Sequence, residues 1–352
     1  MLRKAKLAAL ALFKGVGGFE LVANSNWRRQ RLLILCYHGT SLEDEHQWRP
    51  RLYMQPQRLE QRLEALRAMR CSILPLGEAL ERLRTHDLPP RSVAVTFDDG
   101  TYDFYRQAYP LLKKYGIPVT VYQSTYYTDH EIPVFNLICS YMLWKWRGGQ
   151  LPPSSELGIL EPMDLRTEAG RHRVVRCLID RSDRDHLTGV QRNEIARKLA
   201  QILGIDYVAL TSKRILQLMN AREVKEIARD GVDVQLHTHR HRTPEEESLF
   251  RREISDNRSR LRILTGNEGR HFCYPSGIYR QEFFDWLKTE RIESATTCDA
   301  GLVSPDDNPL LLSRFIDTSG RTQVEFESWL SGVGSMIALR RATPQRYILP
   351  ED

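Results

Sequence analysis

Short apolar runs recur along the chain, and each one ends at a polar or turn-forming residue. Runs of this length, rich in β-branched and aromatic residues and separated by stretches with helical spacing, predict strands that alternate with helices. Eight strands are expected, at residues 32–37, 72–76, 92–97, 118–123, 232–236, 271–274, 294–298 and 313–317. Eight strands in this alternation favour a β/α barrel.

Two intervening segments, residues 56–70 and 221–231, carry apolar residues at the spacing of an amphipathic helix. The second ends at Gly231, a residue favoured after a helix. The pattern changes between about residues 127 and 216, where an aromatic-rich segment, a Pro-Pro loop and two arginine-rich helical segments separate two strands. That stretch is too long for a loop, so we expect a helical insertion in the barrel.

The ends of the chain differ from its middle. We expect residues 1–28 to form a basic amphipathic segment, residues 29–326 the barrel with its insertion, and residues 327–352 a C-terminal tail. On a helical projection of residues 2–16, one side is basic and the other is apolar. The basic side carries Arg3, Lys4, Lys6 and Lys14, and the apolar side carries Leu2, Ala5, Ala9, Leu12 and Val16. This arrangement is typical of a helix on an anionic membrane surface. Leu7 and Leu10 fall on the basic side, so a helix packed against the barrel is an equal alternative.

Composition narrows the class of protein. The 352 residues are 41% hydrophobic and 27% charged, values typical of a globular chain and not of a disordered or fibrous one. The longest apolar run, at residues 7–13, is far shorter than the ~20 residues of a membrane-spanning helix, so we expect no integral membrane protein. A net charge of +6 permits an acidic partner, but we expect no nucleic acid.

Cysteine spacing and the N-terminus both favour the cytoplasm. The six cysteines are far apart and include no C-x-x-C pair, so we expect reduced thiols. Lys14 interrupts the apolar stretch of the N-terminus and no A-x-A cleavage signature follows, which argues against a signal peptide. We therefore expect a cytoplasmic protein, with weak association of residues 1–28 with the inner face of a membrane.

Residues suited to catalysis or metal binding lie directly after three of the predicted strands. Asp98 and Asp99 come after SVAVTF, three histidines come after VDVQL, and Pro275-Ser276-Gly277 come after HFCY. In a β/α barrel the active site is built at the carboxyl ends of the strands, where loops from several strands converge. We therefore expect these three segments to share one site.

The two carboxylates of VTFDDG repel each other and need a cation or strong hydrogen bonds if they are buried. Side chains alternate along a strand, so Asp98 and Asp99 should point in different directions, and Gly100 allows the sharp turn that brings both to one cleft. One could bind a metal while the other handles a proton. Taken alone, Asp-Asp-Gly is more typical of a helix cap or an Asx-turn.

Histidines of QLHTHRHRTP complete a possible ligand set. His237 and His241 have i, i+4 spacing, and with Asp99 they match a catalytic zinc site of three protein ligands and a water. Spacing does not decide which two histidines bind, because His237 could instead pair with His239, or His239 could face solvent. The Pro-Ser-Gly turn, ordinary by itself, could present a backbone N–H to a developing oxyanion.

At these segments the chain resembles the NodB-type polysaccharide deacetylases, metal-dependent enzymes on a distorted β/α barrel that remove acetyl groups from N-acetylated sugars. The T-F-D-D-G motif matches residues 96–100, which implies that Asp98 is the base and Asp99 a metal ligand. The H-[ST]-x-x-H motif matches residues 237–241, which implies that His237 and His241 are ligands. The opening ILCYHGT and an F-x-Y-P-x-G motif at residues 272–277 resemble one subgroup, and they suggest Tyr274 and Pro275 as substrate-binding residues.

Two departures from the family concern the base and the acid. Cys273 stands where many members carry an arginine beside the catalytic base, and no histidine follows His271 to serve as the late general acid. Arg314 could replace the arginine or contact substrate, and His38 could reach the site as the acid.

The resemblance implies a hydrolase of N-acetylated sugars or glycans with a divalent metal, zinc being the expected ion, and with Asp98, His38 and the Ser276 N–H in the reaction. Such a metal polarises the acetyl carbonyl and lowers the pKa of bound water toward ~7. The alternatives are hydrolysis of another amide, such as a cyclic imide, an amidohydrolase with an H-x-H pair, and a non-catalytic glycan-binding relative. Asp98 argues against the last, because binding alone needs no base.

Overall fold

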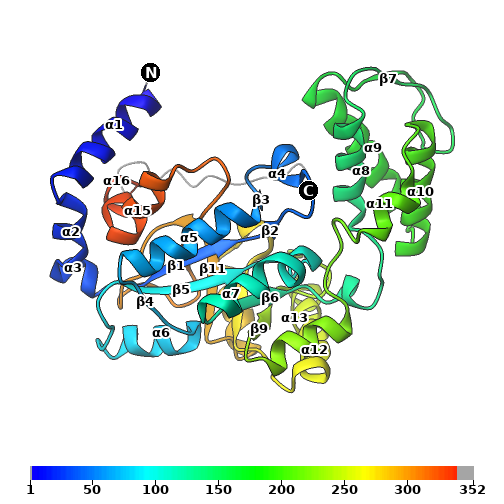
Figure 1. Cartoon of the computed structure of the whole chain (residues 1–352). Helices are drawn as coiled ribbons and strands as arrows, with labels where there is room; N and C mark the ends of the chain where they lie inside the picture. Colours follow the sequence, from blue (N-terminus) through cyan, green and yellow to red (C-terminus); the bar gives the residue numbers. More distant parts are fainter. Residues whose placement is uncertain (1, 339–352) are drawn as a thin grey trace. The chain divides into compact units, whose positions relative to one another are not determined.

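A closed ring of seven parallel strands forms the centre of the computed structural model, which describes residues 2–338 (Figure 1). Around the ring the strands are β1 (Leu33–Tyr37), β12 (Leu312–Ile316), β11 (Ser294–Ala300), β10 (His271–Cys273), β9 (Asp233–Leu236), β6 (Thr120–Gln123) and β5 (Ser92–Phe97). Pairing of β5 with β1, Leu33 opposite Val93, closes the ring. The expected β/α barrel is confirmed.

One expected strand lies outside the ring. All eight predicted runs contain a strand, but β4 (Ser72–Ile73) pairs only with β5 and is two residues long. Pro75 follows at the N-cap of the next helix, where its fixed φ and missing N–H suit a helix start better than a longer strand. A second short parallel pair joins β2 (Gly39–Thr40) to β3 (Tyr53–Met54).

Helices alternate with the strands. In chain order they are α4 (Glu45–Trp48), α5 (Pro56–Ala68), α6 (Leu76–Arg84), α7 (Tyr109–Tyr115), α12 (Ala221–Arg229), α13 (Glu247–Thr265) and α14 (Glu282–Thr289), with a π-helix at Phe104–Ala108 before α7 and a 3-10 turn at Pro275–Gly277. The expected helices at residues 56–70 and 221–231 are α5 and α12. Gly231 follows α12 with a φ of 91°, a conformation that glycine adopts without strain.

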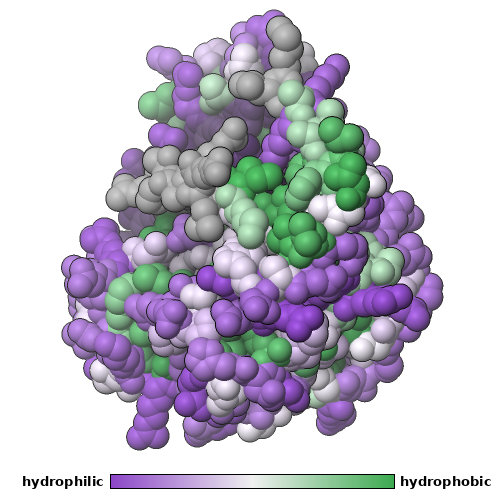
Figure 2. Space-filling view, turned by 90° about the vertical axis from the view of Figure 1, so that its left-hand side faces the viewer, coloured by the Kyte–Doolittle hydropathy of each residue, from purple (hydrophilic) through white to green (hydrophobic). Residues whose placement is uncertain are grey.

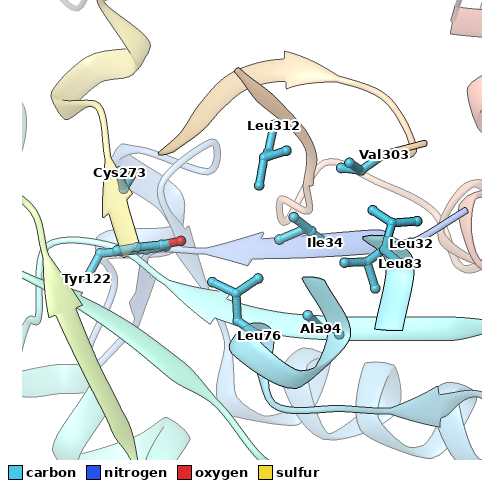
Figure 3. Close-up of a cluster of buried hydrophobic side chains, with 10 residues drawn as sticks. Leu32, Ile34, Leu76, Leu83, Ala94, Tyr122, Cys273, Val303 and Leu312 are labelled. Carbon is cyan, nitrogen blue, oxygen red and sulfur yellow. The ribbon is translucent and has the colours of Figure 1, made fainter. Parts of the chain in front are cut away.

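Alternation along the strands divides the barrel interior into an apolar end and a polar end. Ile34, Ala94 and Leu312 point inward, and α6 packs Leu76 and Leu83 against them (Figure 3). This cluster fills the barrel near the amino ends of β1 and β5. Two residues further along the same strands, the inward positions are polar, so the site lies beyond an apolar floor.

The two ends of the chain form a helical layer. It consists of α1 (Leu2–Gly15), α2 (Gly18–Ala23), α3 (Asn26–Arg29), α15 (Gln323–Ser331) and α16 (Val333–Ala338), and α15 contacts α1, α2 and α16. The prediction of a tail from residue 327 was therefore wrong for residues 327–338. Phe326, Trp329 and Leu330 are buried, and a capping box between Thr322 and Glu325 starts α15. The rest of the predicted tail, residues 339–352, lies outside the described residues.

The N-terminal segment forms three helices, α1, α2 and α3, between residues 2 and 29. A glycine at position 17, with a φ of 80°, separates α1 from α2. Between residues 2 and 338, no helix has both the length and the apolar composition needed to cross a bilayer.

A second compact unit comprises residues 101–103 and 127–220, close to the insertion expected at about 127–216. It contains α8 (Phe135–Lys145), α9 (Glu168–Arg184), α10 (Gly189–Ile202), α11 (Tyr207–Ser212) and the antiparallel pair β7 (Gln150–Leu151) and β8 (Met163–Asp164). Helix α8 is buried from Ile138 to Leu143 and contacts both α9 and α10, which gives this unit its own core.

Candidate active site

Asp98 continues the alternation of β5 into the barrel. Ala94 and Thr96 precede it on the inward side, and the Asp98 N–H donates to the Tyr37 carbonyl at 2.9 Å, so the ladder extends one residue beyond β5. Its buried carboxylate meets Arg314 of β12. Nη1 and Nη2 of Arg314 donate to the two carboxylate oxygens at 2.7 and 2.8 Å, a bidentate pair.

Arg314 is itself fixed by the barrel wall. Its Nε donates to the Thr297 carbonyl at 2.9 Å, and Nη1 lies 3.3 Å from Thr96 Oγ1. The side chain is fully buried. Arg314 thus holds the carboxylate of Asp98 from within the barrel, and a role in contacting substrate directly, which the sequence also suggested, does not fit its burial.

Three further side chains approach Asp98 Oδ2. The thiols of Cys36 and Cys273 each lie 3.5 Å from this oxygen, and His38 Nε2 lies 3.7 Å from it. Cys273 Sγ is also 3.2 Å from Arg314 Nη2. The cysteine that stands in place of the family's arginine is therefore a neighbour of the ion pair, while a strand two places along the ring supplies the guanidinium.

The ion pair determines the charge state of the carboxylate. Burial alone would raise the pKa of Asp98, but the charge and hydrogen bonds of Arg314 outweigh it, with smaller contributions from His38 and His237, and hold this pKa well below its ordinary value. Burial raises the pKa of both neighbouring thiols, Cys36 and Cys273. At neutral pH the site therefore contains a carboxylate between two protonated thiols.

Asp99 turns away from Asp98 toward two histidines. Its Oδ1 lies 3.1 Å from His237 Nε2 and 3.2 Å from His241 Nε2. The two imidazole rings meet edge to face with centroids 4.9 Å apart. One donor atom from each of the three residues lies within 4.8 Å of the others. Two imidazole nitrogens and a carboxylate oxygen are suitable zinc ligands, and three protein ligands are the number used in catalytic sites, so the donor set fits such an ion.

Hydrogen bonds behind His237 set its tautomer. Nδ1 lies 2.8 Å from the Cys273 carbonyl and must donate to it, so Nε2 donates to Asp99 Oδ1 only when the imidazole is protonated, and it offers a lone pair to a metal ion when the ring is neutral. Burial lowers the pKa of His237, but the hydrogen bond and charge of Asp99 and the charge of Asp98 more than compensate and raise it above the ordinary value. Burial would likewise raise the pKa of Asp99, yet its hydrogen bonds to His237 and His241 bring it well below the usual range.

Several residues at this end of the barrel have a left-handed backbone conformation. Asp99, Thr238, His241 and Ser276 all have positive φ, between 55° and 68°. Gly100 follows with a φ of 72°, and a Cβ there would lie 1.9 Å from the Gln123 side chain. Such conformations cost about 1–3 kcal/mol each and cluster at functional sites. The strain turns the Asp99 and His241 side chains out of regular strand geometry and toward one another.

His239, the third histidine of the loop, is not in this donor set. Its Nδ1 lies 2.9 Å from Thr125 Oγ1, and its ring packs edge-on to Tyr126. The side chain is half-buried, so it does not simply face solvent. This geometry disfavours the H-x-H pairing of His237 with His239.

The Pro-Ser-Gly turn follows β10 as expected, and the residues in and beside it differ in backbone conformation and burial. Ser276 adopts the left-handed conformation that turns the chain. Tyr274 is buried, and its hydroxyl donates to the Leu310 carbonyl at 3.0 Å. Pro275 is buried as well. Both side chains pack inside the fold, and their contact with substrate stays a prediction.

Two residues of α13 support the histidine loop and were not foreseen. Asn257 accepts the His237 N–H at 3.0 Å, and its Nδ2 donates to the Gln123 carbonyl and to Thr125 Oγ1. Glu253 accepts from the His239 and Arg240 N–H groups. Both are buried on the inner face of a helix at i, i+4 spacing, and a polar pair among apolar inner positions was the available signal.

Comparison with known sequences agrees with this geometry. The sequence profile of a family described as polysaccharide deacetylase matches residues 85–147 and 190–292. Over 72 residues the chain is 36% identical to poly-beta-1,6-N-acetyl-D-glucosamine N-deacetylase from Staphylococcus aureus. That region is 20% of this chain, and it spans a quarter of the curated relative's length.

Solved structures share the fold. The Streptococcus pyogenes deacetylase PplD, solved with acetate, superimposes with a TM-score of 0.56 at 18% identity, over 86% of this chain and 97% of that one. IcaB from Ammonifex degensii gives a TM-score of 0.53 at 18% identity, with the same coverage of both chains. At these identities the likeness establishes the barrel and its connections, and the chemistry rests on the side chains described above.

Proposed function

We propose that this chain, which contains a polysaccharide deacetylase domain, hydrolyses the acetamido group of an N-acetylated sugar in a polysaccharide or glycolipid and releases acetate. One observation carries the proposal: an ion-paired carboxylate, Asp98, adjoins an Asp-His-His donor set at one end of the barrel. Amide hydrolysis needs a proton acceptor beside an electrophile for the carbonyl, and these groups have that arrangement.

The proposed substrate class is a glycan that contains N-acetylhexosamine. The curated relatives are named for activity on poly-beta-1,6-N-acetyl-D-glucosamine, and the acetamido group is the bond that such an enzyme cleaves. The proposal extends this reaction type, cleavage of an acetamido group, to the present chain.

The site residues would have separate roles in the reaction. Asp99, His237 and His241 would hold a divalent cation, zinc being the expected ion. Such an ion supplies Lewis-acid chemistry, polarising the acetyl carbonyl and lowering the pKa of the attacking water. Asp98 would accept that water's proton, and Arg314 would keep its carboxylate ionised and oriented. His38, 3.7 Å from Asp98 Oδ2, would protonate the departing amine, and the Ser276 N–H would stabilise the oxyanion.

A substrate panel tests the proposal. Metal-loaded protein is incubated with N-acetylglucosamine oligomers, a lipid-linked N-acetylhexosamine and a cyclic imide, and released acetate or ring-opened product is measured. We expect acetate from at least one of the sugar substrates, and loss of the signal after chelation with recovery on adding zinc. Turnover of the cyclic imide alone, or binding of oligomers without acetate release, would contradict the proposed reaction.

A further inference from the structure

Helix α1 turns its charged side inward. Leu10 is buried in a cluster with Phe19 and Val333. On the same side, Arg3 donates to the Gly320 carbonyl at 2.5 Å, and Lys14 pairs with Glu327 at 2.5 Å. The inner side of α1 is therefore satisfied by contacts with the region around α15, and two of its four basic residues are used there.

The outer side of α1 is apolar. Ala5, Ala8 and Ala9 are exposed, and Leu12 and Val16 have 71% and 73% of their surface exposed. A helix on the surface of a globular protein normally places polar residues outward and apolar residues inward, so α1 has the reverse of the usual polarity. Leucine and valine side chains at such exposure contribute little burial free energy to the described fold.

Neighbouring helices extend this surface. Leu21 of α2 is 75% exposed, and Met336 and Ile337 of α16 are also exposed. Figure 2 views the molecule from this side and shows hydrophobic residues gathered in one patch in its upper half. We define the outer apolar face as Leu12, Val16, Leu21 and Met336 with the exposed alanines of α1. A continuous apolar surface of this kind indicates an interaction site.

Charge around the outer apolar face is basic. Helix α1 contains no acidic residue, and at 100° per residue Lys4 and Lys6 flank its outer side on opposite edges. Residues 1–31 contain seven Lys and Arg and a single acidic residue, Glu20. Their net charge of +6 equals that of the whole chain, so the remaining residues are balanced. Glu20 is itself paired with Arg91, which leaves no free acidic group among residues 2–31.

We propose that the outer apolar face docks on the surface of an anionic lipid bilayer, with α1 lying in the plane of the headgroups. Apolar side chains would enter the boundary between headgroups and acyl chains, while Lys4 and Lys6 at the edges of the helix would meet lipid phosphates. The charge favours anionic lipid, because Lys4 and Lys6 lie at the two edges of the face and the one acidic residue between positions 2 and 31, Glu20, is paired with Arg91. The inference is independent of the reaction proposed above, since it concerns another face of the barrel unit.

Vesicle flotation of the full chain tests this docking. Vesicles of phosphatidylcholine with phosphatidylglycerol are compared with phosphatidylcholine alone, at low and high salt. We expect the protein to float with the anionic vesicles at low salt and to be released largely by high salt. The triple variant Leu12→Asp, Val16→Asp, Leu21→Asp should bind the anionic vesicles at least about tenfold more weakly than the wild type. Ile263→Asp is the matched control, because Ile263 of α13 is 66% exposed outside the face, and this variant should bind as the wild type does.

Each other outcome overturns the docking. Equal flotation of the triple variant and the wild type, each with an unaltered melting temperature, would show that the face makes no contact with lipid. A wild type that does not bind vesicles but dimerises, and that the triple substitution makes monomeric, would assign the face to a second copy. Binding that arises only on deletion of residues 339–352 would mean that this segment covers the face. Acetate release from soluble oligomers, measured on the same variants, should be unchanged, so a failure here is distinguishable from failure of the proposed reaction.

Discussion

A buried guanidinium and a buried carboxylate face each other inside the barrel, and the carboxylate depends on the guanidinium to remain charged. Arg314 and Asp98 are joined by two hydrogen bonds of 2.7 and 2.8 Å. Pairs of this kind are not intrinsically stabilising, because desolvation offsets the attraction, but removing one partner leaves a costly lone charge. The pair is therefore best understood as a device that fixes the position and ionisation of one carboxylate.

Arg314→Met should separate the structural and chemical roles of the pair. We expect a loss of about 3–5 kcal/mol in the free energy of unfolding, since Asp98 is left buried without its partner. Arg314→Lys keeps the charge without the bidentate geometry, so it should lose less stability but still most of the rate, at little change in KM. Urea unfolding and acetate release measure the two effects, and a fully active Arg314→Met enzyme would refute the positioning role.

The same pair gives a pH dependence with a definite sign. The pKa of Asp98 is lower in the folded chain than its unfolded value of about 3.9, so the pairing contributes stability above that pH. The contribution is lost as the pH falls through the lowered pKa. In Arg314→Met the effect of burial is no longer offset by Arg314 and raises the pKa of Asp98. The difference in unfolding free energy between wild type and Arg314→Met should therefore be largest at neutral to alkaline pH, shrink as the pH falls through this raised pKa, and be smallest under strongly acidic conditions.

Metal binding can be assigned residue by residue within one loop. His237→Ala and Asp99→Ala should each lose bound zinc after loading and dialysis, because each removes one of three converging donors. His239→Ala is the matched control from the same loop, since the His239 ring contacts Thr125, and it should retain the metal. The zinc content of each variant is measured by atomic emission. Loss of zinc in all three variants would indicate collapse of the loop and not loss of individual ligands.

His38 is the acid candidate that the site brings nearest to the base. His38→Gln should lower kcat more than KM and remove one limb of the pH profile, because a glutamine cannot donate an acidic proton. His46→Gln, which alters a histidine bound to Ser41 and Gln55, is the control. An unchanged rate and pH profile in His38→Gln would leave its 3.7 Å approach to Asp98 without a catalytic role.

At the scale of elements, the position of each strand could be predicted from its apolar run, and so could the different directions of Asp98 and Asp99. Alternation over six residues is a local property, which is why Ala94, Thr96 and Asp98 could be assigned to one side. Pairing between distant strands is not local. The contact between Arg314 and Asp98, and the place of β4 outside the ring, follow from which strands are neighbours, and no pattern within a single run encodes that.

Support of the histidine loop by α13 was not predicted, although its polar inner pair was a signal. Asn257 makes three hydrogen bonds to the ends of β6 and β9, but a lone asparagine in an amphipathic helix is usually a solvated residue. Its importance became visible only when β6 and β9 were placed beside the helix. The packing of Tyr274, whose hydroxyl donates to the Leu310 carbonyl, likewise depends on distant segments and could not be read from the family motif.

Asn257→Leu tests the coupling of helix to site. Three buried polar groups would lose a partner, at about 1–3 kcal/mol each, so the domain should be less stable by several kcal/mol. Zinc affinity should fall about 10–100-fold, as is usual when groups that orient a ligand are removed. Asn257→Asp, which still accepts from the His237 N–H, should recover part of the affinity. Unaltered zinc binding in the leucine variant would show that α13 does not position His237.

At the scale of the whole molecule, the two ends of the chain form one layer on the barrel unit, and the insertion has its own core. The sequence left the packing of the N-terminal segment open, because burial of Leu10 with Phe19 and Val333 requires a helix beyond residue 327, where the sequence suggested only a tail. The extent of the insertion was predictable, because a long departure from the β/α pattern is visible in the sequence without knowledge of tertiary contacts. The candidate site draws on residues from 38 to 314, all in the barrel unit.

The central claim is that the Asp98 carboxylate and the Asp99, His237 and His241 donor set act together in amide hydrolysis. The rate of acetate release per bound metal ion, compared between wild type and Asp98→Asn, tests it most directly. We predict equal zinc content and a rate about 10²–10⁴-fold lower in the variant, the usual contribution of a general base. A fully active Asp98→Asn enzyme, or a metal-free wild type with an undiminished rate, would contradict the account.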